Sequence, residues 1–354
     1  MADKNKALEA FFKSAEKKFG ANAVMWLGAQ NPIDCNKLSS GSLLIDKVLG
    51  GGLGYGRIAE LYGYESSGKS TLALQFVRQC QLAGGTAMYV DLENALDLEY
   101  ARTLGVDVNK VIFAQPTTAE EALDLIYEAI NTGAINFIVL DSIAAMTPTA
   151  VLNGEAGDQQ IGLLARLLST NLKKLVSALN KSNCALLAIN QIRMKVNTGF
   201  MMGNPETTAG GNALKFFASQ RIELKKSLAI KEGGNQIGQV TKVKCVKNKL
   251  ATPMQVAEVP LIYGKGFSAE DEIVDLGIEY GFIQKSGSWF VTTDEQRLQG
   301  KEAVKAYYKE HPDLAEELKQ KVKEKLFKTN LKQDFTETLP DGTVIDSVTG
   351  EVLE

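Results

Sequence analysis

The chain has 354 residues, of which 45% are hydrophobic and 23% charged, with a formal net charge of −3 at pH 7. This composition is ordinary for a water-soluble protein, and the overall charge does not indicate a nucleic-acid partner. The N-terminus has no apolar leader segment, no apolar run reaches membrane-spanning length, and four widely spaced cysteines with one histidine make no zinc set. We therefore expect a cytoplasmic protein with no membrane partner.

The N-terminal region predicts a helix followed by a short strand. Apolar side chains recur at helical spacing on one side of residues 4–19, lysines lie largely on the other side, and Gly20 is a natural helix terminator. Residues 23–27 could form a strand before the Asn31-Pro32 break. Such a segment can pack onto its own core or onto a neighbouring subunit, and the sequence leaves both interpretations open.

The strongest local signal is the run Gly-Tyr-Glu-Ser-Ser-Gly-Lys-Ser at residues 63–70, which fits G-x-x-x-x-G-K-[ST]. Residues 57–62 before it predict a strand and residues 71–77 after it predict a helix, which is the setting of a phosphate-binding loop. The glycines let backbone N–H groups point inward at an anion, and the helix N-terminus adds partial positive charge. Lys69 would reach the β- and γ-phosphates of a nucleotide, and the Ser70 hydroxyl would bind Mg²⁺. The alternative is a chance glycine-rich turn before a helix.

Polar side chains follow three further predicted strands. Glu93 could orient or activate a water near the γ-phosphate, and a surface acid on a loop is an equally open interpretation. The apolar run 137–140 predicts a buried parallel strand ending at Asp141, which would hold the Mg²⁺ shell or, alternatively, cap the next helix. A third strand ends in Asn190-Gln191. Strands that alternate with helices predict a doubly wound, mostly parallel α/β sheet.

Two loops and a basic region point to a polyanionic partner. The loops run from 151 to 162 and from 193 to 212, and the second is long for a compact domain and follows a strand that ends at the nucleotide site. Residues 193–249 hold eleven basic side chains and three acids, a balance of +8. Lys242 and Lys244 fall on one face of an alternating strand, which is either a solvated face or a DNA contact.

Composition changes after the glycine-rich segment 264–266. The residues that follow predict a small α+β unit, with helices around 269–280 and 301–328. The chain therefore divides into four predicted parts: an N-terminal segment at 1–31, a nucleotide-binding core at 32–266, a small α+β domain at 267–330 and a tail at 331–354.

The tail is acidic. Residues 334–354 hold six Asp and Glu side chains and no Lys or Arg, and such tails often screen or compete for a basic surface. The turn signal Pro-Asp-Gly-Thr at 340–343 also predicts local order, because 344–345 and 352–353 could pair around it as a hairpin.

Several longer runs resemble the bacterial RecA family of homologous-recombination ATPases, over roughly residues 5–330. The matching runs are GYESSGKS at 63–70, DLENALDLEYAR at 91–102, NQIRMK at 190–195, GNPETTAGGNALKFFAS at 203–219 and VKNK at 246–249. The resemblance implies a RecA-like P-loop ATPase core with a mostly parallel twisted sheet flanked by helices, an N-terminal helix-strand arm for subunit docking, and a small C-terminal α+β domain. It further implies an ATP- and Mg²⁺-dependent filament on single-stranded DNA, which pairs that strand with a homologous duplex.

Carried over residue by residue, the resemblance implies roles at matching positions. Glu93 would activate the hydrolytic water, and Gln191 would link the γ-phosphate to the second loop. Lys247 and Lys249 would act in trans on the neighbouring subunit's ATP. The ATP-binding positions are Gly63, Glu65, Ser66, Ser67, Gly68, Lys69, Ser70, Thr71, Asp97 and Tyr100. Tyr100 would stack on adenine, and Ser70 with Asp141 would hold the metal.

The resemblance also assigns DNA contacts. The two loops would hold the primary strand mainly through its backbone, which leaves base edges free to test homology. The matching positions are Ile161, Gly162, Arg166, Ser169, Lys173, Arg193, Met194, Val196, Gly210, Gly211 and Asn212. Lys242 and Lys244 match the face that holds the second DNA.

The chain departs from the family pattern at three positions of the nucleotide site. Tyr64 stands where the family usually has Pro, Asn94 where it has His, and Ser70 where it has Thr. The Ser70 change is chemically mild because the hydroxyl remains. The second loop is also about two residues longer than the common pattern.

The resemblance implies partners besides DNA. These are other copies of the chain, a single-strand-binding protein, and a LexA-type repressor whose self-cleavage the family promotes in the SOS response to DNA damage. Two rival functions stay open: a ring-forming motor of the same core fold, such as a helicase, and a P-loop enzyme that acts without DNA, such as a small-molecule kinase. The second rival should have a discrete acceptor pocket and leaves the basic region without a purpose.

Overall fold

The structure, a computed structural model, describes residues 2–20, 23–24, 26, 36–154, 162–194, 206–267, 269–331, 336–338 and 344–346. The chain divides into two compact units, Met1–Asn36 and Lys37–Glu354, which are described separately below. Across the described ranges, no helix combines the length and the apolarity that crossing a bilayer requires.

The first unit contains helix α1 (Ala2–Phe19), which confirms the predicted N-terminal helix. The helix ends at Gly20, whose φ of 94° lies in the left-handed region that glycine adopts without strain. Phe12 packs against Trp26 with ring centroids 5.6 Å apart, while Phe19 is 74% exposed. Of the strand expected at 23–27, the described residues 23, 24 and 26 are not in a strand, and the others lie outside the described residues.

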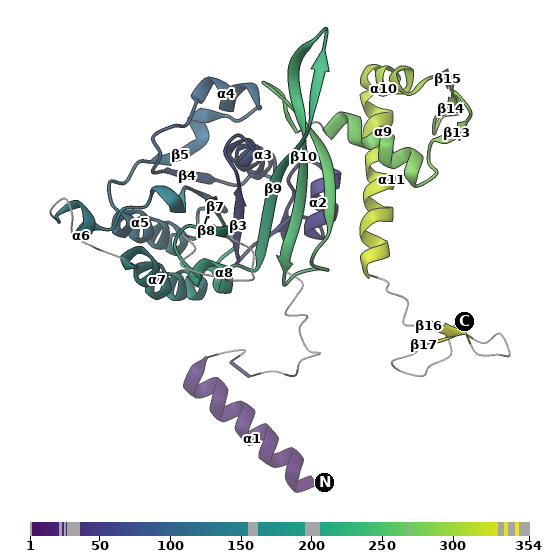
Figure 1. Cartoon of the computed structure of the whole chain (residues 1–354). Helices are drawn as coiled ribbons and strands as arrows, with labels where there is room; N and C mark the ends of the chain where they lie inside the picture. Colours follow the sequence, from purple (N-terminus) through teal and green to yellow (C-terminus); the bar gives the residue numbers. More distant parts are fainter. Residues whose placement is uncertain are drawn as a thin grey trace, which may run out of the picture. The chain divides into compact units, whose positions relative to one another are not determined.

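A ten-stranded sheet forms the centre of the second unit (Figure 1). Strands β3, β7, β6, β4, β5 and β9 run parallel, which confirms the predicted mostly parallel sheet, while β10, β11 and β12 extend it in antiparallel fashion. Strand β8 pairs antiparallel with β7 off this path. In spatial order the strands are β12 (Gly266–Phe267), β11 (Val256–Ile262), β10 (Asn235–Asn248), β9 (Gln220–Glu232), β3 (Ile58–Gly63), β7 (Ala185–Met194), β6 (Phe137–Asp141), β4 (Ala87–Asp91) and β5 (Val111–Ala114), with β8 (Glu206–Thr208) beside β7.

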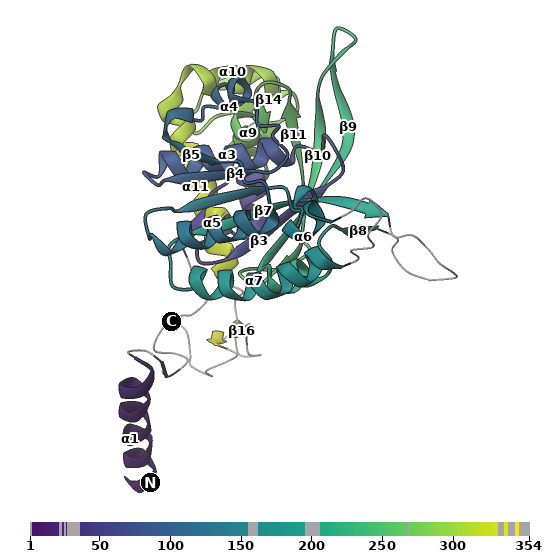
Figure 2. The ribbon, with the colours of Figure 1, turned by 90° about the vertical axis from the view of Figure 1, so that its left-hand side faces the viewer.

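Helices cover both faces of the parallel strands (Figures 1 and 2). Apolar residues of α2, α3 and α4 form the core on one face, and those of α5, α7 and α8 form it on the other. Neighbouring strand residues alternate between the two cores, as Leu187 and Ala188 do, so these strands are apolar at nearly every position. The helices that precede residue 266 in this unit are α2 (Leu43–Leu49), α3 (Lys69–Leu82), α4 (Leu98–Thr103), α5 (Ala119–Asn131), α6 (Thr149–Leu152), α7 (Leu163–Leu179) and α8 (Ala213–Phe217).

Helix α2 was not predicted, because the glycines around it suggested only a lead-in to the phosphate loop. Ser42 caps its start by accepting a hydrogen bond from Ile45 N at 3.1 Å, and Gly50 with φ 73° ends it. Short strands β1 (Lys37–Leu38) and β2 (Leu53–Gly54) pair on either side of the helix. A seven-residue helix held by its caps and its buried side gives little periodic signal.

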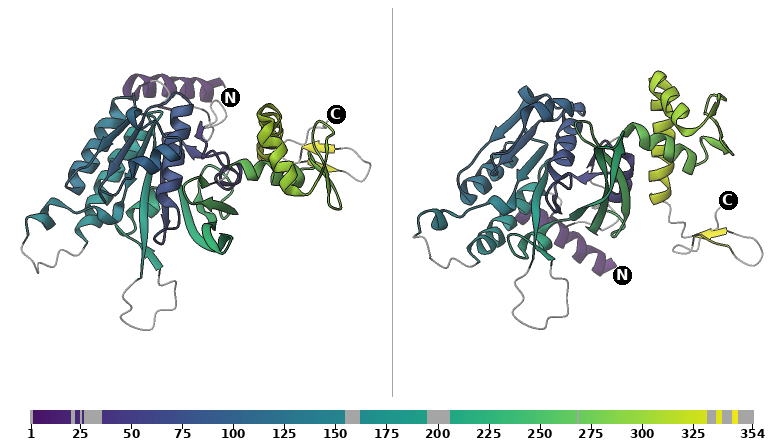
Figure 3. Two further views of the ribbon diagram at one scale, coloured as in Figure 1. Left: turned by 90° about the horizontal axis from the view of Figure 1, so that it is seen from above. Right: turned by 45° about the horizontal axis from the view of Figure 1, so that its top comes forward.

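The C-terminal residues form a small α+β body with its own apolar core (Figure 3). Its elements are α9 (Ala269–Glu279), β13 (Gln284–Ser286), β14 (Trp289–Val291), β15 (Arg297–Gln299), α10 (Lys301–Glu310) and α11 (Pro312–Leu331). The helix predicted over 301–328 is in fact two helices that meet at His311-Pro312. Proline disfavours helical backbone in the residue before it, and His311 has φ −122° and ψ 74°.

The tail contains a two-stranded hairpin, but with a different pairing from the expected one. Strand β17 (Val344–Asp346) pairs with β16 (Thr336–Thr338), which lies before the turn signal. The expected partner 352–353 lies outside the described residues. Threonine at both ends of β16 favours extended backbone, a signal that the acidic Glu337 between them obscured in the sequence.

A buried carboxylate joins the C-terminal body to α2. Glu272 of α9 is 2% exposed and accepts hydrogen bonds from the Ser42 hydroxyl at 2.7 and 2.9 Å and from Leu44 N at 3.3 Å. Burial raises the pKa of Glu272 to about 7, against the hydrogen bonds of Ser42 and Leu44, and Asp46 nearby raises it further. The neutral form of the carboxyl is therefore favoured in the folded protein.

Because the folded pKa lies above the unfolded value, Glu272 stabilises the fold fully only below pH 4.5, and this contribution is lost as pH rises through about 7. We expect Glu272→Gln to remove this dependence, so that the variant gains up to about 3 kcal/mol in unfolding free energy over wild type between pH 5 and pH 8. Denaturant unfolding at four pH values measures the difference. Glu279→Gln, an exposed carboxylate of the same helix, is the control, and parallel pH profiles for wild type and Glu272→Gln would contradict the prediction.

Candidate functional site

The phosphate loop has a backbone shape that its glycines permit. A Cβ on Gly63, the last residue of β3, would lie 2.4 Å from the carbonyl oxygen of Leu224, and one on Gly68 would lie 2.9 Å from Leu261 Cδ2. Gly68 has φ 94° and Ser66 has φ 54°, so the loop curls before α3 begins. Left-handed residues within a short loop are the backbone conformations from which anion-binding loops are built.

Some polar groups of this loop have no hydrogen-bond partner, and a bound anion could serve as that partner. The Ser67 Oγ is buried and has no hydrogen-bond partner among the described residues, and the start of α3 has no side-chain cap. Lys69 Nζ donates to the carbonyl oxygens of Gly63 at 3.2 Å and Tyr64 at 2.8 Å, which keeps the ammonium over the loop. Burial lowers the pKa of Lys69, while nearby carboxylates oppose that shift. Glu65 is exposed on the loop, and the whole arrangement suits a polyphosphate.

The two predicted metal ligands, Ser70 and Asp141, lie together. Ser70 Oγ donates to Asp141 Oδ2 at 3.3 Å, and Tyr89 donates to the same oxygen at 2.6 Å. Burial raises the pKa of Asp141 to about 6, although the Tyr89 hydrogen bond favours the ionised form. A hydroxyl and a carboxylate beside a phosphate loop are the oxygen donors that Mg²⁺ takes along with phosphate and water. The residues present fit that ion.

Glu93 and Gln191 are brought into direct contact. Gln191 Nε2 donates to Glu93 Oε1 at 3.1 Å, and the Ser142 hydroxyl donates to the same oxygen. The Asp91 carboxylate shapes the turn by accepting from the backbone N–H of Glu93 at 3.0 Å and of Leu96 at 3.2 Å. Sequence reasoning missed Ser142 and Asp91, although both lie at strand ends on the edge of the sheet where Glu93 was placed.

The proposed adenine platform lies against the start of α3. The Tyr100 hydroxyl is 2.8 Å from Thr71 Oγ1, and Asp97 caps α4 by accepting from Tyr100 N at 3.0 Å. The structure thus brings Asp97, Tyr100 and Thr71 into one group beside the phosphate loop.

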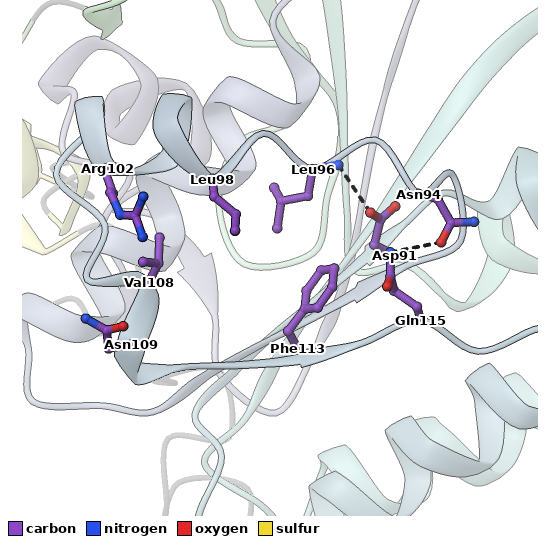
Figure 4. Close-up of a pocket in the computed structure, with 9 residues that line it drawn as sticks. All are labelled: Asp91, Asn94, Leu96, Leu98, Arg102, Val108, Asn109, Phe113 and Gln115. Atoms are coloured by element: carbon purple, nitrogen blue, oxygen red, sulfur yellow. Dashed lines mark hydrogen bonds between the residues drawn. The ribbon is translucent and has the colours of Figure 1, made fainter.

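An open pocket of about 390 Å³ adjoins this group (Figure 4). Gln115 Nε2 donates to Asn94 Oδ1 across the pocket at 2.9 Å. The pocket is also lined by Asp91, whose carboxylate shapes the turn that carries Glu93. Its lining is Asp91, Asn94, Leu96, Leu98, Arg102, Val108, Asn109, Phe113 and Gln115. No residue of the phosphate loop lines it, so this pocket is separate from the phosphate position.

The candidate DNA contacts around the two loops form one surface on α7 and α8. Three of the predicted contacts are exposed on α7 at helical spacing: Arg166, Ser169 and Lys173. Gly210 and Gly211 pack against this helix, since a Cβ on them would lie 2.6 Å from Leu168 and 2.9 Å from Ala165. Gly162 directly precedes α7, and Asn212 directly precedes α8 without a side-chain capping hydrogen bond. The surface is basic and lies beside the segments proposed to bind DNA.

The second loop is anchored by strand pairing. Arg193 pairs with Thr207, and Met194 with Glu206, so residues 193–194 and 206–208 of the predicted 193–212 loop belong to β7 and β8. The Arg193 guanidinium also donates to the carbonyl oxygen of Ala144 at 3.4 Å. The side chain of Met194, and the predicted contacts Ile161 and Val196, lie outside the described residues.

Lys242 and Lys244 lie on β10, away from the loop surface. The strand alternates as predicted, with Thr241, Val243 and Cys245 buried at the positions on either side of each lysine. Lys242 is exposed and pairs across the sheet with Lys225 on β9 and Glu258 on β11. The register therefore puts an acid beside this basic face.

Lys247 and Lys249 follow at the end of β10, beside α8. Lys247 Nζ donates to the carbonyl oxygens of Lys215 at 2.7 Å and Phe216 at 3.0 Å. Burial lowers the pKa of Lys247, and Lys249 and Arg221 lower it further. Phe216 is 72% exposed, an apolar side chain at this edge that sequence reasoning did not single out. The hydrogen bonds of Lys247 thus go to α8 and not to the phosphate loop of its own chain.

Family models match nearly the whole chain, the RecA N-terminal domain over residues 6–268 and the RecA C-terminal domain over residues 271–327. Protein RecA of Thioalkalivibrio sulfidiphilus is 46% identical over 339 residues, covering 95% of this chain and 98% of that protein. Protein RecA of Staphylococcus carnosus is 47% identical over 325 residues, covering 92% and 91%. A crystal structure of the RadB recombinase has a TM-score of 0.49 at 23% identity, covering 65% of this chain and 98% of that chain, a likeness too distant to add to the assignment. On the family models and the two curated relatives, the chain belongs to the RecA family of recombinases.

Proposed function

We propose that the protein is a DNA-dependent ATPase that forms helical filaments on single-stranded DNA and catalyses homologous pairing and strand exchange. One observation supports a structural connection between the nucleotide site and the segment proposed to bind DNA. Strand β7 holds Gln191 against Glu93 and then runs directly into the segment proposed to grip DNA. A change at the γ-phosphate position therefore has a short covalent path to the DNA surface.

In this proposal ATP is the substrate and the chain's own residues position it. The loop N–H groups and Lys69 hold the phosphates, while Tyr100 and Asp97 flank the base. Ser70 and Asp141 would hold Mg²⁺, which supplies charge neutralisation between the phosphates. Glu93 would orient the attacking water and accept its proton, with Ser142 and Gln191 fixing the carboxylate.

The proposed active site is completed by a second copy of the chain. Lys247 and Lys249 lie at an edge with an exposed Phe216, and in a filament they would face the ATP of the adjacent subunit. Positive charge supplied in trans stabilises the charge that develops on transferring phosphates. Hydrolysis would then depend on assembly, and assembly on DNA.

The DNA surface would be built from the α7 face, Arg193 and the Gly210–Asn212 turn, with Lys242 and Lys244 as the site for the second DNA. Backbone contacts suit a protein that must accept any sequence. A single-strand-binding protein and a LexA-type repressor are proposed as further partners, and the cytoplasm as the site of action.

The two rival functions receive less support. The family assignment does not favour a ring-forming motor, and electron microscopy of the complex with DNA would distinguish open filaments from closed rings. A kinase-like enzyme that ignores DNA is opposed by the basic α7 face, which such an enzyme does not need.

The decisive experiment is steady-state ATP hydrolysis with and without homopolymer single-stranded DNA, at several salt concentrations. We expect strong stimulation that weakens as salt rises, because phosphate contacts release counterions. A rate that is indifferent to DNA at every salt concentration would reject the recombinase proposal and leave a P-loop enzyme of another kind.

A further inference from the structure

The phosphate loop makes one direct contact with β8, the strand at the base of the second loop. None of the roles proposed above for the site accounts for this contact. The Tyr64 hydroxyl donates to Glu206 Oε1 at 2.6 Å. Tyr64 is the second residue of the phosphate loop, and Glu206 is the first residue of β8, 142 positions away.

This bond gives the segment between β7 and β8 a second connection to the nucleotide site. On the β7 side, Gln191 contacts Glu93, which is placed near the hydrolytic water. On the β8 side, Glu206 contacts Tyr64 in the phosphate loop. Met194 of β7 and Glu206 of β8 are paired, so both connections reach the same pair of strands. That pair of strands leads to the proposed DNA contacts.

We propose that the Tyr64–Glu206 hydrogen bond is a second coupling element in this chain, through which the phosphate loop and the DNA-binding segment sense each other's ligands. Tyr64 acts as a positioning residue, since its hydroxyl touches Glu206 and not the reacting atoms. The proposal rests on the proposed ATP- and DNA-binding function and adds a regulatory contact to it.

The surroundings of the bond provide the two arrangements that coupling needs. Lys69 Nζ donates to the Tyr64 carbonyl oxygen, so an incoming polyphosphate that attracts Lys69 also releases the backbone of residue 64. Glu206 is also paired with Lys225, whose Nζ lies 3.8 Å from the other carboxylate oxygen and 3.2 Å from Glu223. A shift of Tyr64 would therefore leave Glu206 with Lys225 and change what holds the start of β8.

The test is a thermodynamic cycle on the full chain. The affinity for a fluorescent oligo(dT) is measured by anisotropy with and without a non-hydrolysable ATP analogue, and the ratio of the two affinities is the coupling. We expect Tyr64→Phe, which removes only the hydroxyl, to lower this ratio roughly three- to tenfold. The effect of oligo(dT) on the affinity for the analogue should fall by the same factor, because coupling between binding sites is reciprocal.

Two further variants separate a specific bond from general damage. Tyr64→Phe placed in a Glu206→Ala background should cause no additional loss, because the partner is already gone. Tyr263→Phe removes a hydroxyl that accepts from Gln236 on the distant β10, and it should leave the coupling at the wild-type value. Additive losses in the double variant would reject the proposal.

The outcomes also distinguish this proposal from the one on which it rests. If wild-type protein couples the two ligands and Tyr64→Phe retains the whole ratio, the Tyr64–Glu206 proposal is wrong and the recombinase proposal stands. If the wild-type affinity for oligo(dT) is the same with and without the analogue, both proposals are wrong.

Discussion

Replacing Glu93 by Gln should lower the kcat of DNA-stimulated ATP hydrolysis by roughly 10²- to 10⁴-fold while leaving nucleotide and DNA binding in place. The amide keeps the size of the side chain and can still accept the hydrogen bonds of Ser142 and Gln191 through its oxygen. It cannot accept a proton from water. The loss should therefore lie in the chemical step and not in binding.

The measurement is a comparison of kcat, nucleotide affinity and DNA affinity for Glu93→Gln and wild type. Glu99→Gln is a matched control, since Glu99 is an exposed carboxylate six residues along the chain that pairs with Arg102 on α4. We expect DNA complexes of Glu93→Gln with ATP to dissociate more slowly, because hydrolysis would normally release them. A variant with near wild-type kcat would remove Glu93 from the catalytic role.

Replacing Lys247 by Ala should lower DNA-stimulated kcat by about 10³-fold or more, as for other cationic groups supplied to a phosphate site in trans. Its hydrogen bonds to the end of α8 are a smaller, structural matter, worth about 1 kcal/mol each. Lys231→Ala, an exposed lysine on β9, serves as the control for lost positive charge. Full activity in Lys247→Ala would mean that the site is complete without this lysine.

Mixing the two inactive variants tests whether the site is shared between subunits. In a filament formed from equal amounts of Glu93→Gln and Lys247→Ala, about a quarter of the interfaces join an intact Glu93 to an intact Lys247 from the neighbour. We expect hydrolysis to recover to about that fraction of the wild-type rate. Both residues acting within one chain would give no recovery, and the proposed arrangement in trans would be wrong.

Some features of the fold and the site could be predicted because they depend on local sequence. The phosphate loop is recognisable since a strand, a glycine-permitted curl and a helix start lie within about 20 consecutive residues. Helix α1 and strand β10 were predicted from periods of 3.6 and 2, and the structure confirms both. Helix α2 and the break at His311-Pro312 were missed, because caps and a single proline outweigh average propensity there.

By itself, the sequence determined the class of the protein. The phosphate loop, the strand-ending carboxylates Glu93 and Asp141 and the long matching runs indicated a RecA-type ATPase, and family comparison confirmed that assignment. Each of these signals lies within one continuous stretch of sequence, so it can be recognised without knowledge of the fold.

Only the tertiary structure decided which side chains meet. The contacts of Ser142 with Glu93, of Tyr89 with Asp141 and of Tyr64 with Glu206 join residues 49, 52 and 142 positions apart. Such pairs arise because parallel strands bring their carboxyl ends to one edge of the sheet, whatever their separation in the chain. The order of those strands is set by packing of the two helical layers, a cooperative property that no single segment carries.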